Sequence, residues 1–198
     1  MKRHTSVASF ALAALARLGN RMNSAWIHRR KALLVVLGMT LIGGSVGAQS
    51  ASERLVTMKD ACDPTTFNAL FGPGTCVRSG GVRFADFIAE LTREGKAGAW
   101  HFAPSTTTAQ LGQTLVAVNR GGEVHTFTHV AAFGGGIIPV LNDLAHVPVV
   151  APECTTLELD DFVAPGTTYE EDIAHTGVQR FQCCIHPWMR LEVRVPHD

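Results

Sequence analysis

Acidic residues are missing from the start of this chain. No Asp or Glu precedes residue 49, whereas that stretch holds seven of the 17 basic residues: Lys2, Arg3, Arg17, Arg21, Arg29, Arg30 and Lys31. The formal net charge of zero therefore hides an asymmetry, because the remainder has ten basic residues against 17 acidic ones, a net charge of about −7. A main body this acidic is not expected to bind nucleic acid, since such binding relies on basic side chains.

The chain also lacks an apolar run of the length that membrane spans usually have. The uncharged apolar stretch at residues 32–47 is short for a span, follows basic residues 29–31, and leads into small side chains up to Ala48. This pattern is typical of a secretory signal peptide that is cut after Ala48. We therefore expect residues 1–48 to be a signal peptide, with Met22 as a candidate for the real start. The rest is expected to be exported, with the periplasm as its compartment, and to contact a membrane only if the segment stays uncleaved.

Cysteine is scarce, and the Cys-x2-Cys-His order that attaches a c-type heme is absent. All five cysteines lie after residue 48, in the part where disulfides persist after export. Cys62 and Cys76 bracket a short loop and are expected to form a disulfide. Cys154 and Cys184 could form a second one, but the sequence alone does not fix the pairing.

Internal repeats, low-complexity tracts and phosphate-binding glycine loops are also absent, and residues 49–98 look like a separate extension. Asp63-Pro64 has the form of a helix N-cap followed by proline at the first helical position. Apolar residues at helical spacing predict a helix over residues 82–94, closed by Gly95. We expect this partly helical extension to pack on the domain that follows rather than to bind a partner.

From residue 98 the pattern changes to short strands. They are expected at residues 100–102, 106–108, 115–118, 124–130, 157–159, 178–183 and 191–195. Residues 137–156 contain three prolines and read as a long loop with one helical turn near residues 142–146. Acidic runs at residues 160–161 and 170–172 are expected to be solvated loops, although they could steer a basic partner. Many short strands with frequent turns are typical of a β-sandwich.

Near the C-terminus, Cys183, His186 and Met189 follow one another at Cys-x2-His-x2-Met spacing. Two His and one Cys with a weak axial Met form the copper site that carries single electrons. His125 is the best candidate for the missing imidazole, because it follows a turn and a sandwich gathers its loops at one pole. Cys184 is a poorer candidate for the thiolate ligand than Cys183, because only Cys183 is separated from His186 by two residues. Neighbouring residues of a strand also face opposite sides, so Cys184 should point away from the metal. The remaining histidines, among them His129, are expected to be solvated or packed.

With these residues in view, the chain resembles the cupredoxins, or blue copper proteins, and most of all the amicyanin and plastocyanin branch. Those proteins share an Asn several residues before the first ligand His, matched by Asn119 and His125, and a terminal Cys, His and Met loop, matched by Cys183, His186 and Met189. The resemblance covers residues 99–196 and implies an all-β, Greek-key cupredoxin domain over residues 99–198. It also implies one type 1 copper ion and an exported carrier of single electrons between redox partner proteins.

The resemblance assigns further roles. Asn119 would tie the two ligand loops together by hydrogen bonds. His186 would be the electron exit at an apolar surface, where Pro187 and Trp188 suit a docking rim, although core packing is an equal alternative for Trp188. The chain departs from the compact members in two places: Cys184 directly follows the ligand Cys, and 57 residues separate His125 from Cys183.

Other functions stay open at this point. A copper-delivery protein without a redox partner needs the same ligands. A copper-dependent oxidoreductase subunit would need an open coordination position, against which Met189 argues, and the chain lacks the His-x-His series of multicopper oxidases. Zinc is chemically possible at a Cys/His site, but Met189 gives it little support.

Overall fold

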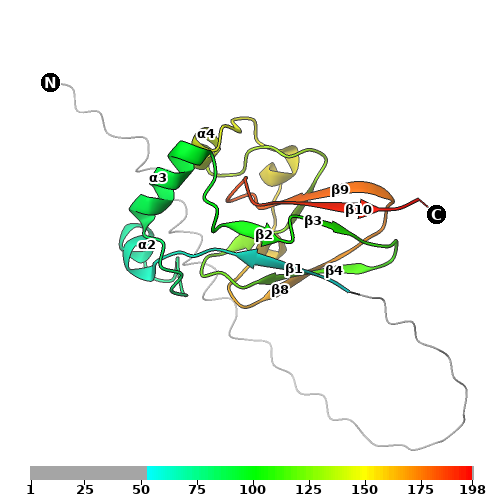
Figure 1. Ribbon diagram of the computed structural model, residues 1–198, viewed down its shortest axis with the longest axis horizontal. Coiled ribbons are helices and arrows are strands. Elements are labelled where there is room, and N and C mark those ends of the chain that lie inside the picture. The colour runs from blue at the N-terminus through cyan, green and yellow to red at the C-terminus, as the bar shows by residue number, and fades with distance from the viewer. Residues whose placement is uncertain (1–52, 198) are drawn as a thin grey trace, which may run out of the picture.

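Two four-stranded sheets form the body of the protein, in a computed structural model that describes residues 53–197 (Figure 1). The signal peptide expected at residues 1–48 lies outside the described residues. Within residues 53–197, no helix combines the length and the apolar character that crossing a membrane requires.

The first sheet has the order β2-β1-β4-β8. Its strands are β1 (Arg54–Lys59), β2 (His101–Ala103), β4 (Thr114–Asn119) and β8 (Thr168–Asp172). β1 runs antiparallel to β2 and parallel to β4, and β4 runs antiparallel to β8. The first strand of the described residues, β1, is therefore an interior strand of this sheet.

The second sheet has the order β3-β10-β9-β6. Its strands are β3 (Thr106–Thr108), β6 (Thr128–Val130), β9 (Gly177–Gln182) and β10 (Arg190–Val195). β9 and β10 form an antiparallel pair joined by the loop at residues 183–189. A short pair, β5 (His125–Thr126) and β7 (Phe162–Val163), lies beside the two sheets.

Alternating side chains from both sheets form one core. Val56 and Met58 of β1 and Leu191 and Val193 of β10 are fully buried, while the residues between them are more exposed. Such period-two burial places apolar side chains on one face of each sheet. Phe181 of β9 belongs to the same cluster, so the two sheets pack as a sandwich.

Two helices lie at one end of the sandwich, next to the loop that joins β9 and β10 (Figure 1). They are α2 (Pro64–Phe71) and α3 (Phe84–Glu94). The helix predicted over residues 82–94 is confirmed as α3, and the predicted N-cap at Asp63 opens α2. The Asp63 side chain accepts hydrogen bonds from the backbone N–H groups of Thr65 and Thr66, as an N-cap does. Gly95 ends α3 with φ at 66°, a left-handed conformation that glycine adopts without strain.

Three local predictions need correction. β1 lies inside the segment 49–98, where no strand was expected, and β8 forms where residues 170–172 were expected to be a loop. Residues 157–159 were predicted as a strand, but a short 3-10 helix, η2 (Leu159–Asp161), occupies this place and leaves Leu159 72% exposed. The Asp161 carboxylate accepts a hydrogen bond from the Glu158 backbone N–H, which closes this turn.

The loop at residues 137–156 contains α4 (Pro139–Leu144) and η1 (Pro152–Thr155).

Candidate metal centre

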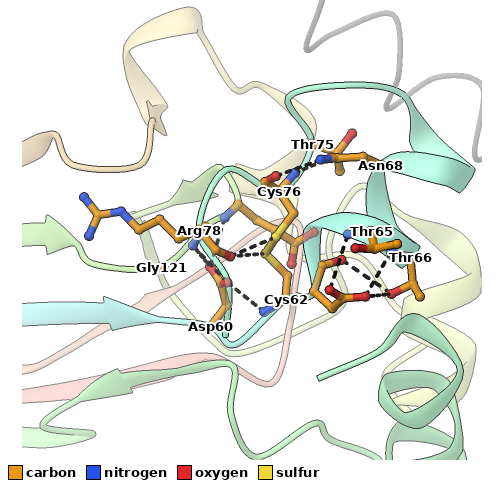
Figure 2. The surroundings of a disulfide bond; sticks show 12 residues. Asp60, Cys62, Thr65, Thr66, Asn68, Thr75, Cys76, Arg78 and Gly121 are labelled. Atoms are coloured by element: carbon orange, nitrogen blue, oxygen red, sulfur yellow. Dashed lines mark hydrogen bonds between the residues drawn. A yellow bond between two sulfur atoms is a disulfide. The ribbon is translucent and has the colours of Figure 1, made fainter. Parts of the chain in front are cut away.

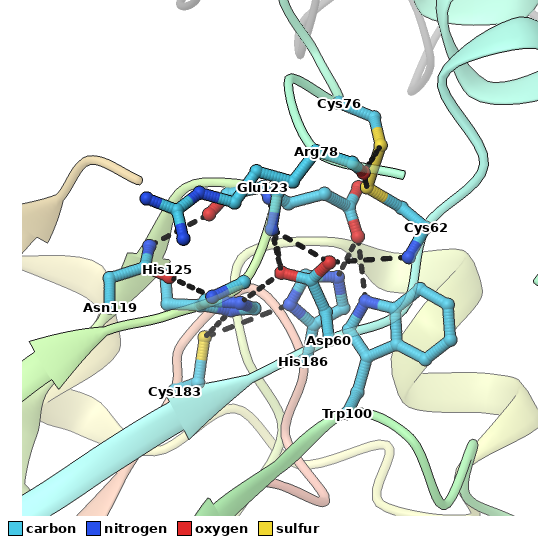
Figure 3. A network of polar contacts seen from close by, with 12 residues as sticks. Asp60, Cys62, Cys76, Arg78, Trp100, Asn119, Glu123, His125, Cys183 and His186 are labelled. Carbon is cyan, nitrogen blue, oxygen red and sulfur yellow. Dashed lines mark hydrogen bonds and ion pairs between the residues drawn. A yellow bond between two sulfur atoms is a disulfide. The ribbon is translucent and has the colours of Figure 1, made fainter. Parts of the chain in front are cut away.

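Three side chains meet at the end of the sandwich that carries α2 and α3. His125 begins β5, Cys183 directly follows β9, and His186 lies in the β9–β10 loop (Figure 3). The Cys183 Sγ atom is 3.9 Å from Nδ1 of His125 and 3.8 Å from Nδ1 of His186. His125 and Cys183 are fully buried and His186 is 4% exposed. The sequence placed these three residues in one site, and the fold brings them together.

The spacing of the three donor atoms suits a metal ion held between them. Metal bonds of about 2.3 Å to sulfur and about 2.0 Å to nitrogen, at the angle of about 120° expected of a trigonal site, separate the two donors by about 3.7 Å. Both Sγ–Nδ1 distances are close to that value. The donor atoms of all three residues lie within 4.8 Å of one another. The geometry therefore fits a single ion bound by one thiolate and two imidazoles.

Met189, the expected axial ligand, is held in the same loop. The Cys183 N–H donates to the Met189 carbonyl at 3.0 Å, and the Met189 N–H donates to the His186 carbonyl at 2.9 Å. These bonds fold the loop back on itself. The Met189 side chain is fully buried and belongs to the same core cluster as Cys183.

Thr126 connects the two ligand loops. Its N–H points at the Cys183 Sγ atom at 3.4 Å, and its hydroxyl accepts from the Cys184 N–H at 2.7 Å. Asn119, to which this task was assigned, makes other bonds. Its side-chain amide donates to the carbonyls of Glu123 and Val163, so it stabilises the turn before His125.

Two buried carboxylates, which the sequence analysis missed, lie behind the imidazoles (Figure 3). Asp60 Oδ2 is 2.9 Å from His125 Nε2, and the two side chains are 1% and 0% exposed. Glu123 Oε2 is 3.9 Å from His186 Nε2 and accepts a 2.6 Å hydrogen bond from the Trp100 indole. Glu123 stands two residues before His125 and could have been noticed, whereas Asp60 is distant in sequence and no motif marks it.

The charges of these groups depend on one another. Burial would raise the pKa of Cys183, but hydrogen bonds and charge from His125 and His186 hold it well below its usual value. Burial would lower the pKa of His125, but hydrogen bonds to Asp60 and Cys183 raise it to about 10. Burial would also raise the pKa of Asp60, yet His125 and two backbone N–H groups lower it to about 2. The two imidazoles thus favour the thiolate form of Cys183, the form that binds metals.

Burial raises the pKa of the Glu123 carboxyl, and this effect outweighs the nearby charge of His186, which acts to lower that pKa. Asp60 adds to this rise because two like charges repel. The two carboxyls therefore differ: Asp60 is a stable anion, and Glu123 holds a proton more readily than an ordinary Glu.

Several solved cupredoxin structures are similar to this chain at low sequence identity. A purple cupredoxin from Nitrosopumilus maritimus is 13% identical, with a TM-score of 0.41 over 72% of this chain and 98% of that one. An amicyanin variant in the Cu(I) form is 17% identical, with a TM-score of 0.34 over 48% of this chain and 73% of that one. A second, reduced amicyanin variant is 20% identical, with a TM-score of 0.32 over 46% and 70%.

The chain is structurally similar to cupredoxins. No protein-family model matches it, and no curated protein sequence does. The fold is a cupredoxin-like β-sandwich with helices.

Both disulfides of this cupredoxin-like chain lie near the site. Cys62 pairs with Cys76, as predicted, and Cys154 pairs with Cys184. The second bond gives Cys184 a structural role and ties the Pro-rich loop to the residue after Cys183. Cys183 is the one free cysteine of the described residues.

The segment between β1 and β2 covers His186. The ring centroids of Trp100 and Trp188 lie 6.5 and 5.5 Å from that of His186, and Phe87 of α3 lies against both indoles. The Trp188 indole donates to the Ala97 carbonyl. Pro187 is buried and Trp188 half-buried, so these two residues do not form an exposed rim.

Proposed function

We propose that this protein is an exported, mononuclear copper protein of type 1 character that carries single electrons. The observation that supports this most is the buried cluster of one thiolate and two imidazoles, each with Nδ1 facing the Cys183 sulfur. His125, Cys183 and His186 would hold the ion, with Met189 as a weak axial ligand.

The donor set favours copper over harder cations. Thiolate and thioether ligands are soft and select Cu(I), and imidazole also suits copper. Zinc prefers four strong N, S or O donors, and a buried thioether does not supply the fourth. Copper bound here would supply a one-electron couple between Cu(I) and Cu(II).

The protein holds the metal-binding side chains in fixed positions. Cys183 is fixed between the strand β9, the Thr126 N–H and the neighbouring Cys154–Cys184 disulfide. His125 is fixed from behind by Asp60. A site whose ligands are held in place before and after electron transfer needs little rearrangement, which favours fast transfer.

Burial distinguishes a carrier from the alternatives. Delivery requires a partner to reach the ion, and an oxidase requires an open position for its substrate. Here the three ligand residues are at most 4% exposed. An electron crosses a few ångströms of packed protein, whereas an ion or a substrate does not, so the closed site favours electron transfer.

Export is part of the proposal. Two disulfides among the described residues are compatible with an oxidising compartment, and the sequence before residue 49 has the pattern of a signal peptide. We place the protein in the periplasm, where its partners would be other redox proteins.

The test is the visible spectrum of the purified protein after addition of Cu(II). We expect one copper per chain and an intense thiolate-to-copper band, absent in Cys183→Ala and lost or strongly shifted in His125→Ala. His129→Ala is the matched control, because His129 is an exposed imidazole four residues along the chain and lies outside the cluster. A colourless copper complex, or a band that survives Cys183→Ala, would refute the proposed function.

A further inference from the structure

Asp60 is the feature of the centre that the ligand motif does not explain. We propose that Asp60 is a positioning residue that fixes His125 for the metal and lowers the reduction potential of the bound copper. This inference rests on the proposed function and concerns the regulation of the same site.

Asp60 contacts the nitrogen of His125 that does not face the other ligands. Its Oδ2 atom lies 2.9 Å from Nε2, while Nδ1 of the same ring faces Cys183 Sγ. A carboxylate at this place holds the ring proton on Nε2 and leaves the Nδ1 lone pair for the metal. The bond also fixes the rotation of the imidazole ring.

The Asp60 carboxylate is itself held by backbone N–H groups (Figure 2). Oδ1 accepts from the N–H groups of Cys62 and Gly122, and Oδ2 accepts from those of Gly122 and Glu123. Several N–H donors on one carboxylate favour its charged form. Asp60 is therefore a rigid, buried anion directly behind a ligand.

The turn at residues 121–122 is shaped to receive this carboxylate. A Cβ atom on Gly121 would clash with the Asp60 carboxylate oxygen, and one on Gly122 would lie 2.7 Å from Cys62 Sγ. Glycine is needed at both places because the backbone approaches Asp60 and the Cys62–Cys76 disulfide so closely. The segment that follows β1 thus takes part in building the metal centre.

The fixed negative charge has a predictable effect on the copper couple. Cu(II) carries one more positive charge than Cu(I), and a nearby anion in a dry environment stabilises the more positive state. Asp60 therefore lowers the potential. Glu123 is a weaker candidate for this role, since its 3.9 Å approach to His186 is too long for a hydrogen bond and its oxygen already accepts from Trp100.

The experiment compares Asp60→Asn, Asp60→Ala and the control Asp63→Asn. Asn is close in shape to Asp but uncharged, so Asp60→Asn should keep the visible band and raise the midpoint potential. Asp60→Ala should in addition weaken copper binding about 10–100-fold, as loss of such outer partners does. Asp63→Asn removes a charge three residues along the chain, at the partly exposed N-cap of α2, where Asn caps equally well, and should leave the potential unchanged.

A second readout needs no copper. In the metal-free protein with labelled histidine, NMR should show an Nε2–H of His125 that lies downfield and exchanges slowly, and Asp63→Asn should retain it. Absence of this protected N–H in the natural chain would overturn the inference, as would equal potentials for Asp60→Asn and Asp63→Asn. Absence of the visible band in the natural chain would instead refute the proposed function, and the ring N–H alone would then decide the role of Asp60.

Discussion

At the scale of single residues, the candidate metal centre depends on groups other than the proposed ligands. Thr126 shows this most clearly, because it joins the loop of His125 to the loop of Cys183. Its hydroxyl accepts the Cys184 N–H at 2.7 Å in a fully buried place, and Thr128 donates to the same oxygen at 3.0 Å. Loss of that oxygen leaves a buried N–H without its acceptor.

Thr126→Val keeps the shape of the side chain and removes the hydroxyl. We expect the free energy of unfolding of the metal-free protein to fall by about 1–3 kcal/mol, the cost of an unsatisfied buried donor. Urea denaturation measures this free energy of unfolding. Thr108→Val, on the exposed face of β3, should change stability by no more than about 0.5 kcal/mol. Equal effects of the two substitutions would show that the Thr126 hydroxyl is not needed.

Residues of the site could be predicted where a local pattern marks them. Cys183, His186 and Met189 stand at fixed spacing, and His125 follows from the need for a second imidazole at the same pole. Asp60 could not be predicted, because its meeting with His125 across 65 residues depends on β1 lying beside β4. A single carboxylate at the end of an unrecognised strand leaves no pattern in the sequence.

At the scale of elements, α3 and the segment after it cover the site. Phe87 of α3 is 3% exposed, and its ring centroid lies 4.6 Å from that of Trp100 and 6.0 Å from that of Trp188. Those indoles flank His186. The helix therefore acts on the centre through two aromatic side chains.

Phe87→Ala should destabilise the protein by about 3–5 kcal/mol, since it removes a large buried ring and leaves a cavity. Leu70→Ala, on the neighbouring helix α2, is the control, because Leu70 is 58% exposed. Its cost should stay within about 0.5 kcal/mol. Urea denaturation distinguishes the two variants. Similar denaturation midpoints would mean that the packing of α3 does not stabilise the folded state.

The elements were predictable where the sequence has a strong period or a cap. Apolar residues at helical spacing and Gly95 predict α3, and Asp63-Pro64 predicts the start of α2. β1 was missed because it follows directly on residues that read as an extension, and only its pairing with β2 and β4 makes it a strand. Residues 157–159 were mistaken for a strand because two Leu around a Glu imitate alternation.

At the scale of the whole molecule, the part of the chain that the structure describes is a sandwich closed at one end over the buried Cys183 side chain. The β1–β2 connection, fixed by the Cys62–Cys76 disulfide, contributes Asp60 and Trp100 to this end. The Cys154–Cys184 disulfide fixes the residue that follows Cys183. Composition and strand pattern predict the sandwich, but the closure depends on contacts between segments distant in sequence.

The central claim, that this closed centre carries single electrons, is tested most directly by a spectroelectrochemical titration of the copper-loaded protein. The account predicts that the thiolate-to-copper band bleaches and returns reversibly, with one electron per copper and a slope of about 59 mV per tenfold change in the ratio of the two forms. The copper should stay bound throughout, because the buried ligands hold it in both states. Release of copper on reduction, or a band that does not return on reoxidation, would contradict the account.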